Sequence, residues 1–447
     1  MKKTERDERL LKCTFLDYRQ TKDFLEDPLI ISRAEGLNYW DRDGRRYLDA
    51  IGGVFVAGLG HRHPRVLDAV RSQMDRLDFP PPLHGIADIT LDLVERIGSV
   101  APPGMTFVKP LSGGSESTEC ALKFARQYWK QAGHPGKYKF VSRYQGYHGG
   151  TFGAMGASGT GKRKTPFEPQ MPGFIKVWPP THYRDVFADW EECNRFAARQ
   201  IEDAIVSEDP ETVAGVIVEP VGNTGGVITP TPGYYRMLRE ICDRHDVLLI
   251  FDEVITGFGR CGAMFAAQAY GTTPDIICSG KGLTSGVIPA GAMIARQGMA
   301  DAFWGEASEG REFAHGHTFA GHPLACAAGI AVINEIEEKG LAARARETGA
   351  YLASRLGELC RHGVVREVRG MGLFRGVEFV RGAGSKEPFP ELGAALKKTS
   401  LANGLILRVD PSWFAVAPAL IAERKDIDEI CDLIDKSLAD ALRVARR

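Results

Sequence analysis

The sequence lacks the features that mark membrane proteins and nucleic-acid-binding proteins. No apolar run approaches the roughly 20 residues that span a bilayer. The first residues, MKKTERDERLLK, lack the apolar core of a signal peptide. Neither sign of charge is in excess, since 56 basic residues stand against 57 acidic ones for a formal net charge of −1. Electrostatics therefore gives no argument for binding nucleic acid or an anionic membrane, and we expect a soluble, cytoplasmic protein that binds neither.

Disulfides and metal sites are not expected either. The nine cysteines are odd in number, dispersed and without C-x-x-C spacing, which favours free thiols in a reducing compartment. The pairs His61/His63 and His315/His317 have no acids or cysteines in ligand spacing, so they predict no metal site. A chain of 447 residues can bury roughly three quarters of its unfolded surface, so it needs neither disulfides nor metals for stability.

From about residue 90, apolar runs alternate with helical patterns. Continuous apolar strands between helices are typical of a mainly parallel sheet with helices on both faces, so the predicted fold class is α/β. The expected strands are Met105–Lys109, Lys139–Ser142, Phe174–Trp178, Val213–Glu219, Val247–Asp252, Asp275–Cys278 and Ala290–Ala295, and the clearest helices are Glu116–Lys130, Trp190–Val206 and Tyr234–His245.

The chain length and a change of pattern near Lys339-Gly340 indicate more than one domain. We predict a large domain over residues 71–338 and a C-terminal small domain over residues 339–447. Residues 1–70 are expected to form a segment that joins the small domain. The C-terminal part should contain helices at 341–362, 392–403 and from 426 onward, with strands at 364–368, 372–379 and 405–408.

Two strand ends carry the side chains with the most evident chemistry. The run LLIF ends in Asp252-Glu253, and the run Ile276–Cys278 is followed by Ser279-Gly280-Lys281. Parallel strands bring their carboxyl ends to one edge of a sheet, where open α/β folds bind ligands. A lysine at this edge can be desolvated and made nucleophilic, so Lys281 is a candidate for covalent chemistry.

A phosphate site is predicted at the segment Ser112-Gly-Gly-Ser115, which precedes a helical pattern. Small residues at a helix start expose backbone N–H groups, which bind phosphate together with the helix dipole. The alternative interpretation is an ordinary serine-capped helix start. Tyr147, after another strand end, offers an aromatic face at the same edge.

Two short motifs suggest nucleotide binding instead. The segment 257–262 fits G-x-G-x-x-G, but it does not lie directly between a strand and a helix. The segment 156–162 fits the P-loop pattern G-x-x-x-x-G-K, but Arg163 follows it where a hydroxyl must reach magnesium. A P-loop-like NTPase is therefore the outside alternative.

A phosphate at a helix start, a flat ring against an aromatic side chain, a carboxylate and a lysine together describe one ligand. Pyridoxal 5'-phosphate has an aldehyde that forms a Schiff base with a lysine, a phosphate that needs fixed N–H donors and a ring nitrogen that needs an acid partner. Lys281, Asp252, Ser115 and Tyr147 therefore predict this cofactor.

The chain also resembles the class III aminotransferases, the ω-amino-acid branch of the fold-type-I pyridoxal phosphate enzymes, over almost its whole length. The resemblance implies a seven-stranded sheet, a smaller α+β domain built from both chain ends, and a homodimer or tetramer with shared active sites. The matching segments are YLDAIGG, GHRHP, GGSESTECALKFAR, YHGGTFGAMGASG, VAGVIVEP, LLIFDEVITGFGR, PDIICSGKGL, HTFAGHPLACAA and LILRVDPSWFAVAPAL.

The resemblance implies the catalytic roles of two residues. Lys281 would bond to the cofactor and, once the substrate releases it, carry a proton between the substrate carbon and the cofactor carbon. Asp252 would keep the ring nitrogen protonated, so that the ring accepts electrons, while burial and cationic groups lower the pKa of the lysine. Gly114 and Ser115 would bind the phosphate.

Other matching residues would surround the cofactor. Tyr147 and Val254 would hold the ring between them, and His148 lies beside Tyr147 in the matching segment. Glu219 matches a glutamate near the cofactor. Thr318 would reach the phosphate from the partner subunit.

The substrate pocket indicates a co-substrate. Phe55 and Arg408 match the pocket aromatic residue and the arginine that binds a substrate carboxylate, for which a guanidinium fork is suited. Several ω-aminotransferases have a glutamate at the position of Thr224, and many relatives have a glutamine at the position of Ile255. Both departures resemble pyruvate-using amine and β-alanine transaminases more than enzymes that use 2-oxoglutarate. A third departure, Gly113 in place of a serine, affects the phosphate loop.

We therefore expect a pyridoxal phosphate-dependent aminotransferase with a ping-pong mechanism. It would move an amino group from an amine or ω-amino acid to a 2-oxo acid, with pyruvate as the expected acceptor. The same residues would serve an aminomutase or a decarboxylating relative, which are the alternatives within this cofactor class. The sequence does not determine the donor.

Overall fold

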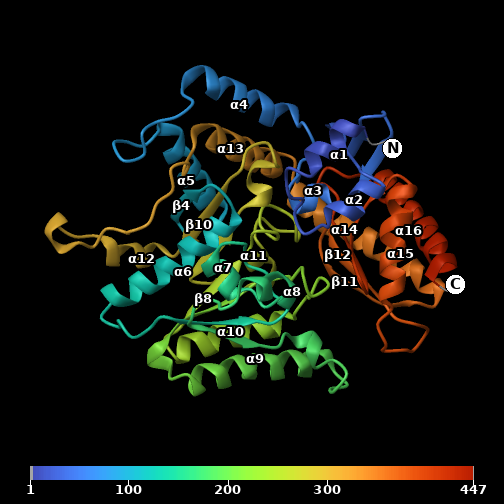
Figure 1. The fold of residues 1–447 in the computed structure, drawn as a ribbon. Coiled ribbons are helices and arrows are strands. Elements are labelled where there is room, and N and C mark those ends of the chain that lie inside the picture. The colour runs from blue at the N-terminus through green and yellow to red at the C-terminus, as the bar shows by residue number, and fades with distance from the viewer. Residues whose placement is uncertain (1–3, 446–447) are drawn as a thin grey trace.

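A seven-stranded sheet forms the centre of the computed structural model, which describes residues 4–445 (Figure 1). Strands β5 to β9 run parallel to one another, whereas β10 is antiparallel to both of its neighbours, β4 and β9. The spatial order is β4 (Phe107–Leu111), β10 (Gly291–Ala295), β9 (Ile276–Ser279), β8 (Leu248–Asp252), β7 (Val213–Val218), β5 (Lys139–Arg143) and β6 (Phe174–Val177). The predicted α/β class and all seven predicted strands are confirmed, with bounds that differ by one or two residues.

Buried side chains alternate between the two faces of this sheet. On β8, Leu248 and Ile250 pack into one core with α6 (Gly114–Gln131), whereas Leu249 and Phe251 belong to the core on the other face. That second core includes residues of α9 (Trp190–Ser207) and α10 (Pro232–Arg244). Because both faces are covered, the strands are continuous apolar runs, and this made them visible in the sequence.

Three further helices pack beside the β4 edge of the sheet: α4 (Pro64–Arg76), α5 (Asp88–Val100) and α13 (Pro323–Glu338). The C-terminal part contributes α14 (Leu341–Gly357), α15 (Pro390–Ala402) and α16 (Arg424–Ala445), which Figure 1 shows together at the side opposite α12. Shorter helices are α1 (Glu5–Leu11), α2 (Thr21–Glu26), α3 (Gly52–Phe55), α7 (Phe152–Ala157), α8 (Gly161–Lys164), α11 (Ala266–Tyr270) and α12 (Gln297–Ala300).

Two four-stranded sheets lie outside the central one. The first joins β1 (Ile31–Glu35), β2 (Asn38–Asp41) and β3 (Arg46–Asp49) to β13 (Leu405–Ile406), so strands from both ends of the chain pair with each other. The second has the order β11 (Val365–Met371), β12 (Phe374–Phe379), β15 (Trp413–Val416) and β14 (Arg408–Asp410). The predicted strand 405–408 is thus two strands that belong to different sheets.

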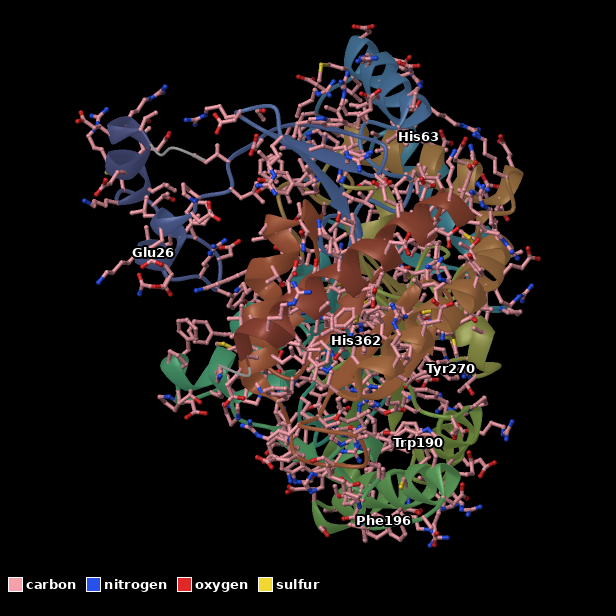
Figure 2. The ribbon with its side chains drawn as sticks, turned by 90° about the vertical axis from the view of Figure 1, so that its right-hand side faces the viewer. Glu26, His63, Trp190, Phe196, Tyr270 and His362 are labelled. Carbon is pink, nitrogen blue, oxygen red and sulfur yellow. The ribbon has the colours of Figure 1, made fainter. Side chains whose placement is uncertain are left out.

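The N-terminal helices α1 and α2 stand at one side of the molecule, where Figure 2 marks them with Glu26, apart from the C-terminal helices near His362. All nine cysteines are free. Among residues 4–445, no helix combines the length and the apolar character needed to cross a membrane.

Candidate active site

Loops from five strands meet at one edge of the central sheet. Strands β5, β7, β8 and β9 are parallel, and β4 shares their direction because β10 is antiparallel to both β4 and β9. The cavity at this edge measures about 160 Å³. Its lining includes every predicted cofactor-binding residue except Thr318. The lining residues are Gly114, Ser115, Tyr147, His148, Gly149, Glu219, Asn223, Asp252, Val254, Ile255 and Lys281.

Lys281 is held in a strained backbone conformation directly after β9. Its φ is 38°, in the left-handed region that residues other than glycine seldom adopt. The preceding Gly280 lies against the start of α6, where a Cβ on it would approach Gly114 Cα to 3.2 Å. The tight turn therefore places the lysine next to the helix start.

The electrostatic surroundings of Lys281 favour its neutral amine. Burial lowers the pKa of Lys281 below its ordinary 10.5, against the charges of Asp252 and Glu219, which raise it. The positive charges of Arg408 and Arg163 add to the lowering. A lowered pKa increases the fraction of neutral lysine, which is the nucleophilic form.

The two acids after β8 point in different directions. Asp252 lies at the cavity, with Oδ2 at 2.7 Å from His148 Nδ1 and Oδ1 accepting the Val254 N–H at 3.1 Å. Glu253 instead accepts the first two backbone N–H groups of α11, at 2.5 and 2.8 Å. Of these two acids, only Asp252 therefore lines the cavity, and His148 orients it.

The start of α6 approaches the neighbouring loops too closely for larger side chains. A Cβ on Gly114 would lie 2.7 Å from Val254 Cγ1, and one on Gly149, whose φ is 143°, would lie 2.8 Å from Ser115 Oγ. Ser115 Oγ accepts the Gly150 N–H at 3.1 Å. The first backbone N–H groups of this 18-residue helix have no partner within the helix, which suits them to an anion.

Glu219 connects two loops of the cavity. Its Oε1 accepts the Tyr147 N–H at 3.0 Å and its Oε2 accepts the Asn223 N–H at 3.1 Å. Burial raises the pKa of Glu219, and the nearby Asp252 charge adds to this. The contacts give Glu219 a positioning role, since it fixes the loops after β5 and β7.

Asn223 is a cavity residue that the sequence analysis missed. It is buried, and within residues 4–445 its Oδ1 has no hydrogen-bond partner. The available signal was its place in a glycine-rich loop, four residues after Glu219. That signal is shared by many ordinary loops, so the sequence did not single it out.

Three predicted residues lie outside this lining. Phe55 is only 1% exposed, and its ring packs 5.1 Å from the ring of Phe374 in the core. Thr318 is exposed on the segment before α13. Arg408, at the start of β14, is half-buried and its Nε lies 3.2 Å from Asp410 Oδ2.

The lining fits pyridoxal phosphate by the chemistry of its groups. The start of α6 offers backbone donors for a phosphate, Asp252 offers a carboxylate for the ring nitrogen, and Lys281 offers an amine for the aldehyde. The unpartnered Asn223 Oδ1 is an acceptor that a cofactor hydroxyl would satisfy. The cavity therefore contains a protein group for each of the three parts of the cofactor: the phosphate, the ring nitrogen and the aldehyde.

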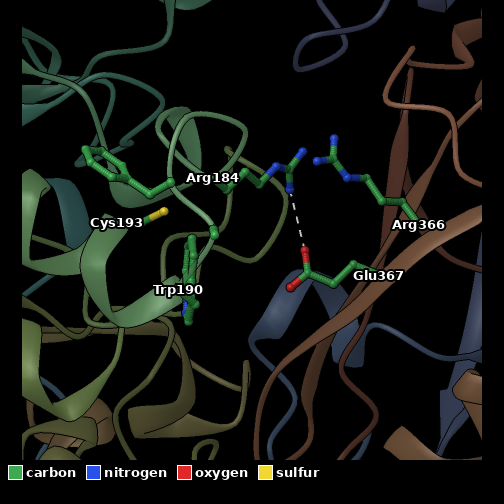
Figure 3. A pocket seen from close by; sticks show the side chains of 7 residues that line it. Arg184, Trp190, Cys193, Arg366 and Glu367 are labelled. Carbon is green, nitrogen blue, oxygen red and sulfur yellow. Dashed lines mark hydrogen bonds and ion pairs between the residues drawn. The ribbon is translucent and has the colours of Figure 1, made fainter.

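A second cavity, of about 260 Å³, lies at the surface beside α9 and β11 (Figure 3). Its charged groups pair with one another: Arg184 Nη1 lies 3.5 Å from Glu367 Oε2, and Arg366 Nη2 lies 2.7 Å from Asp185 Oδ1. Burial raises the pKa of the Cys193 thiol, which keeps it protonated. This cavity therefore offers no activated group for catalysis.

The nucleotide-binding motifs do not form nucleotide sites. Residues 156–162 run from the end of α7 into α8, so no strand leads into the loop as a P-loop requires. A Cβ on Gly159 would lie 2.2 Å from the Arg143 carbonyl oxygen, so this loop is packed against the end of β5. Residues 257–262 form turns that end before α11.

Comparison with known proteins agrees with this geometry. The Aminotransferase class-III family matches residues 20–438. A probable aminotransferase of Mycobacterium tuberculosis is 39% identical over 94% of this chain and 91% of its own length. The putrescine–pyruvate aminotransferase of Pseudomonas aeruginosa is 34% identical over 95% of this chain and 93% of its own length.

Solved structures with the same fold include transaminases. An (S)-enantioselective ω-transaminase from Thermomicrobium roseum superposes with a TM-score of 0.92 at 35% identity, covering 97% of this chain and 98% of that one. An amine transaminase from an uncultivated Pseudomonas species, solved with pyridoxal phosphate bound, gives a TM-score of 0.91 at 35% identity with the same coverage.

Proposed function

The chain belongs to the class III aminotransferases, which are pyridoxal phosphate-dependent enzymes of fold type I, and from this premise we propose that it transfers amino groups from an ω-amino donor to pyruvate. The transamination itself, from an amine or ω-amino acid to a 2-oxo acid, is the activity of the family. The main support for this site is that Lys281, Asp252 and the start of α6 line one cavity.

Pyruvate as the acceptor is supported by two positions near the cavity. Ile255 lines it where many relatives have a glutamine, and Thr224 stands where several have a glutamate. Thr224 Oγ1 donates to the Gln145 carbonyl at 2.7 Å. Because this side chain is not an acid, it does not compete with the substrate carboxylate for Arg408. Arg408 is instead paired with Asp410 and exchanges that partner for the carboxylate of the acceptor.

When bound, pyridoxal phosphate supplies an aldehyde that captures the amine and a ring that takes up the electrons of the broken C–H bond. The residues of the chain bind and orient it. The backbone N–H groups of Gly114 and Ser115 would hold the phosphate, and Tyr147 and Val254 would flank the ring. Asp252, oriented by His148, keeps a proton on the ring nitrogen.

Lys281 moves the proton that transamination requires. Its Nζ, whose neutral form the lowered pKa favours, would remove a proton from the donor carbon that bears the amino group. The same Nζ would then give this proton to the cofactor carbon, as the transfer of the amino group to the cofactor requires. Glu219 keeps the loops after β5 and β7 in place around this transfer.

The position of Thr318 supports a homodimer, or a tetramer built from such dimers. Thr318 is exposed and does not line the cavity of its own chain, so in our proposal it completes the phosphate site of the partner subunit. Large apolar side chains are exposed on the same segment and on the loop that touches it: Phe319 is 59% exposed, Leu83 95%, and the ring of Phe79 lies 5.9 Å from that of Phe319. Exposed apolar patches of this kind mark interfaces.

We also propose a cytoplasmic location and a division into three parts. Free cysteines support a reducing compartment. The pairing of β3 with β13 supports a small domain to which residues 1–70 and 339–447 both contribute, around a large domain of residues 71–338.

The test is a donor and acceptor screen with the purified holoenzyme. We expect alanine to form from pyruvate in equal amounts with the aldehyde or oxo acid derived from the donor, and to form faster than glutamate from 2-oxoglutarate. Faster glutamate formation would contradict the acceptor assignment. A product isomeric with the donor, formed without any oxo acid, would instead support the aminomutase alternative.

A further inference from the structure

A second arginine stands at the edge of the cavity without a role in the proposed function. Arg163 lies on α8, directly after the segment that resembles a P-loop. Its guanidinium carbon lies 4.3 Å from the ring centroid of Tyr18 and 4.7 Å from that of Tyr147. The two tyrosine hydroxyls lie 3.3 Å apart. Tyr147 lines the cavity, so the guanidinium is held against the wall of the site.

The charge of Arg163 is not neutralised by the protein. Within residues 4–445, no carboxylate forms an ion pair with it, whereas the adjacent Lys164 pairs with Glu168 at 3.8 Å and Arg408 pairs with Asp410. Aromatic rings bind the face of a guanidinium, and a hydrogen bond to Tyr147 uses only part of the five N–H donors at its rim. A half-buried arginine held in this way presents its donors to a ligand.

Arg163 and Arg408 act on the same amine. The positive charges of both lower the pKa of Lys281, and the charge of Arg163 also lowers the pKa of Arg408, which burial lowers first. Both guanidinium groups are therefore within electrostatic reach of the reacting centre. Two cations around one amine suit substrates that carry an acid group besides the amino or oxo group.

We propose that Arg163, held by Tyr18 and Tyr147, determines donor specificity by binding the anionic end of an ω-amino acid, while Arg408 binds the carboxylate of the oxo acid. This inference rests on the proposed function and names its donor class. The donor carries a carboxylate or sulfonate at the end remote from its amine. A guanidinium fork pairs with either group through two N–H donors.

The experiment compares two donors that differ only in the acid group. β-Alanine and propylamine are each assayed with pyruvate, using wild-type holoenzyme and the variant Arg163→Gln. We expect kcat/KM for β-alanine to fall about 30-fold, mainly through KM, because a charge-assisted bidentate contact is lost. We expect the value for propylamine to change less than about threefold. Arg163→Lys should restore part of the loss as a point charge.

Lys162→Gln is the matched control, since Lys162 is the exposed neighbour of Arg163. It should leave both donors unchanged. Calorimetric binding of 3-hydroxypropanoate, an acid without an amine, to the holoenzyme should weaken in Arg163→Gln and not in Lys162→Gln. This second measurement does not depend on turnover.

Three outcomes would overturn the assignment: an equal loss for both donors in Arg163→Gln, an unchanged value for β-alanine, or a loss for β-alanine that Lys162→Gln reproduces. A wild-type enzyme that uses propylamine and not β-alanine would also overturn it. The proposed function fails in a different way, because a wild-type enzyme without the activity forms alanine from neither donor.

Discussion

At the scale of single residues, the proposed chemistry depends on Lys281, whose burial and charged neighbours control its pKa. Burial and two arginines lower the pKa of its amine, while Asp252 and Glu219 oppose them. The strained φ of 38° fixes the lysine at the end of β9. Single substitutions of these charged neighbours can therefore show how each one changes the pKa of Lys281.

Replacing the lysine should remove the chemistry and leave the fold. In Lys281→Ala we expect kcat to fall by about 1,000-fold or more, because covalent capture and proton transfer are both lost. The absorption band of lysine-bound cofactor should also be missing from the spectrum. Lys130→Ala, at the exposed end of α6, is the control and should retain both. A lysine-bound cofactor band in Lys281→Ala would assign the attachment to another lysine.

The pH dependence of cofactor capture should report the charges around Lys281. Only the neutral amine adds to an aldehyde, so the rate for the apoenzyme should rise with pH and level off below 10.5. Arg163→Gln removes a positive charge, raises the pKa of Lys281 and should shift the profile to higher pH. Asp252→Asn removes a negative charge and should shift it to lower pH.

Stopped-flow absorbance after mixing apoenzyme with pyridoxal phosphate measures these profiles. Lys130→Ala should follow the wild type throughout. Shifts of the opposite sign in Arg163→Gln and Asp252→Asn would show that the named charges do not control the lysine.

At the scale of secondary-structure elements, ion pairs connect β12 to the segment before α9. Glu378 on β12 accepts Arg184 Nη1 at 2.8 Å and Arg369 Nη1 at 2.6 Å, and its side chain is 13% exposed. Arg366 Nη1 adds a longer contact at 3.8 Å. Figure 3 shows Arg184 and Arg366 side by side at the surface cavity. Glu378 forms ion pairs both with Arg184, from the segment before α9, and with Arg366 and Arg369 on β11.

Removing the Glu378 charge should destabilise the protein in a pH-dependent way. Burial by itself raises the pKa of Glu378, but Arg184 and Arg369 outweigh it, so the pKa lies below 4.5. A lowered folded-state pKa adds stability above the unfolded value, and this stability is lost as the pH falls through the folded value. Glu378→Gln should therefore cost about 3 kcal/mol near pH 7, and less below about pH 4.

The midpoints of thermal unfolding at the two pH values measure this difference. Glu387→Gln is the matched control, since Glu387 pairs with Arg381 at 2.7 Å while 67% exposed. It should change stability by less than about 1 kcal/mol. An equal deficit for Glu378→Gln at both pH values would mean that packing, rather than charge, accounts for the loss.

At the scale of the whole molecule, our proposal makes the site incomplete in one chain. The cavity is lined by Lys281, Asp252 and the start of α6, whereas Thr318 is exposed and does not line it. If two chains share their sites, the particle should have at least twice the 48.9 kDa mass of the chain. Analytical ultracentrifugation measures that mass directly.

Hybrid dimers should show which chain supplies Thr318. Thr318→Glu places a negative charge beside the phosphate, and Lys281→Ala removes the nucleophile, so each parent homodimer should have little activity. When the two variants are co-expressed and the hybrid is purified by two tags, one site carries both defects and the other carries none. We expect about half of the wild-type specific activity, because distant sites without shared partners contribute independently.

Absence of recovery in the hybrid would place Thr318 and Lys281 in the same site of one chain. Co-expression of wild type with Lys281→Ala is the control, and it should give the same half activity. The comparison therefore separates a shared site from a self-contained one.

The sequence by itself determined the seven strands, the α/β class and the main groups of the cavity. Strands buried on both faces are continuous apolar runs, and the chemistry of Lys281, Asp252 and Ser115 lies directly at their ends. Both signals are local, so they can be read along the chain. The family resemblance added Val254, Glu219 and the expectation for Thr318.

Only the tertiary structure decided which distant residues meet. It made β10 antiparallel, paired β3 with β13, packed Phe55 against Phe374 and placed Asn223 in the cavity. It also brought Arg163 onto the rings of Tyr18 and Tyr147. These contacts join segments far apart in the chain, and their energies depend on packing that has no local pattern.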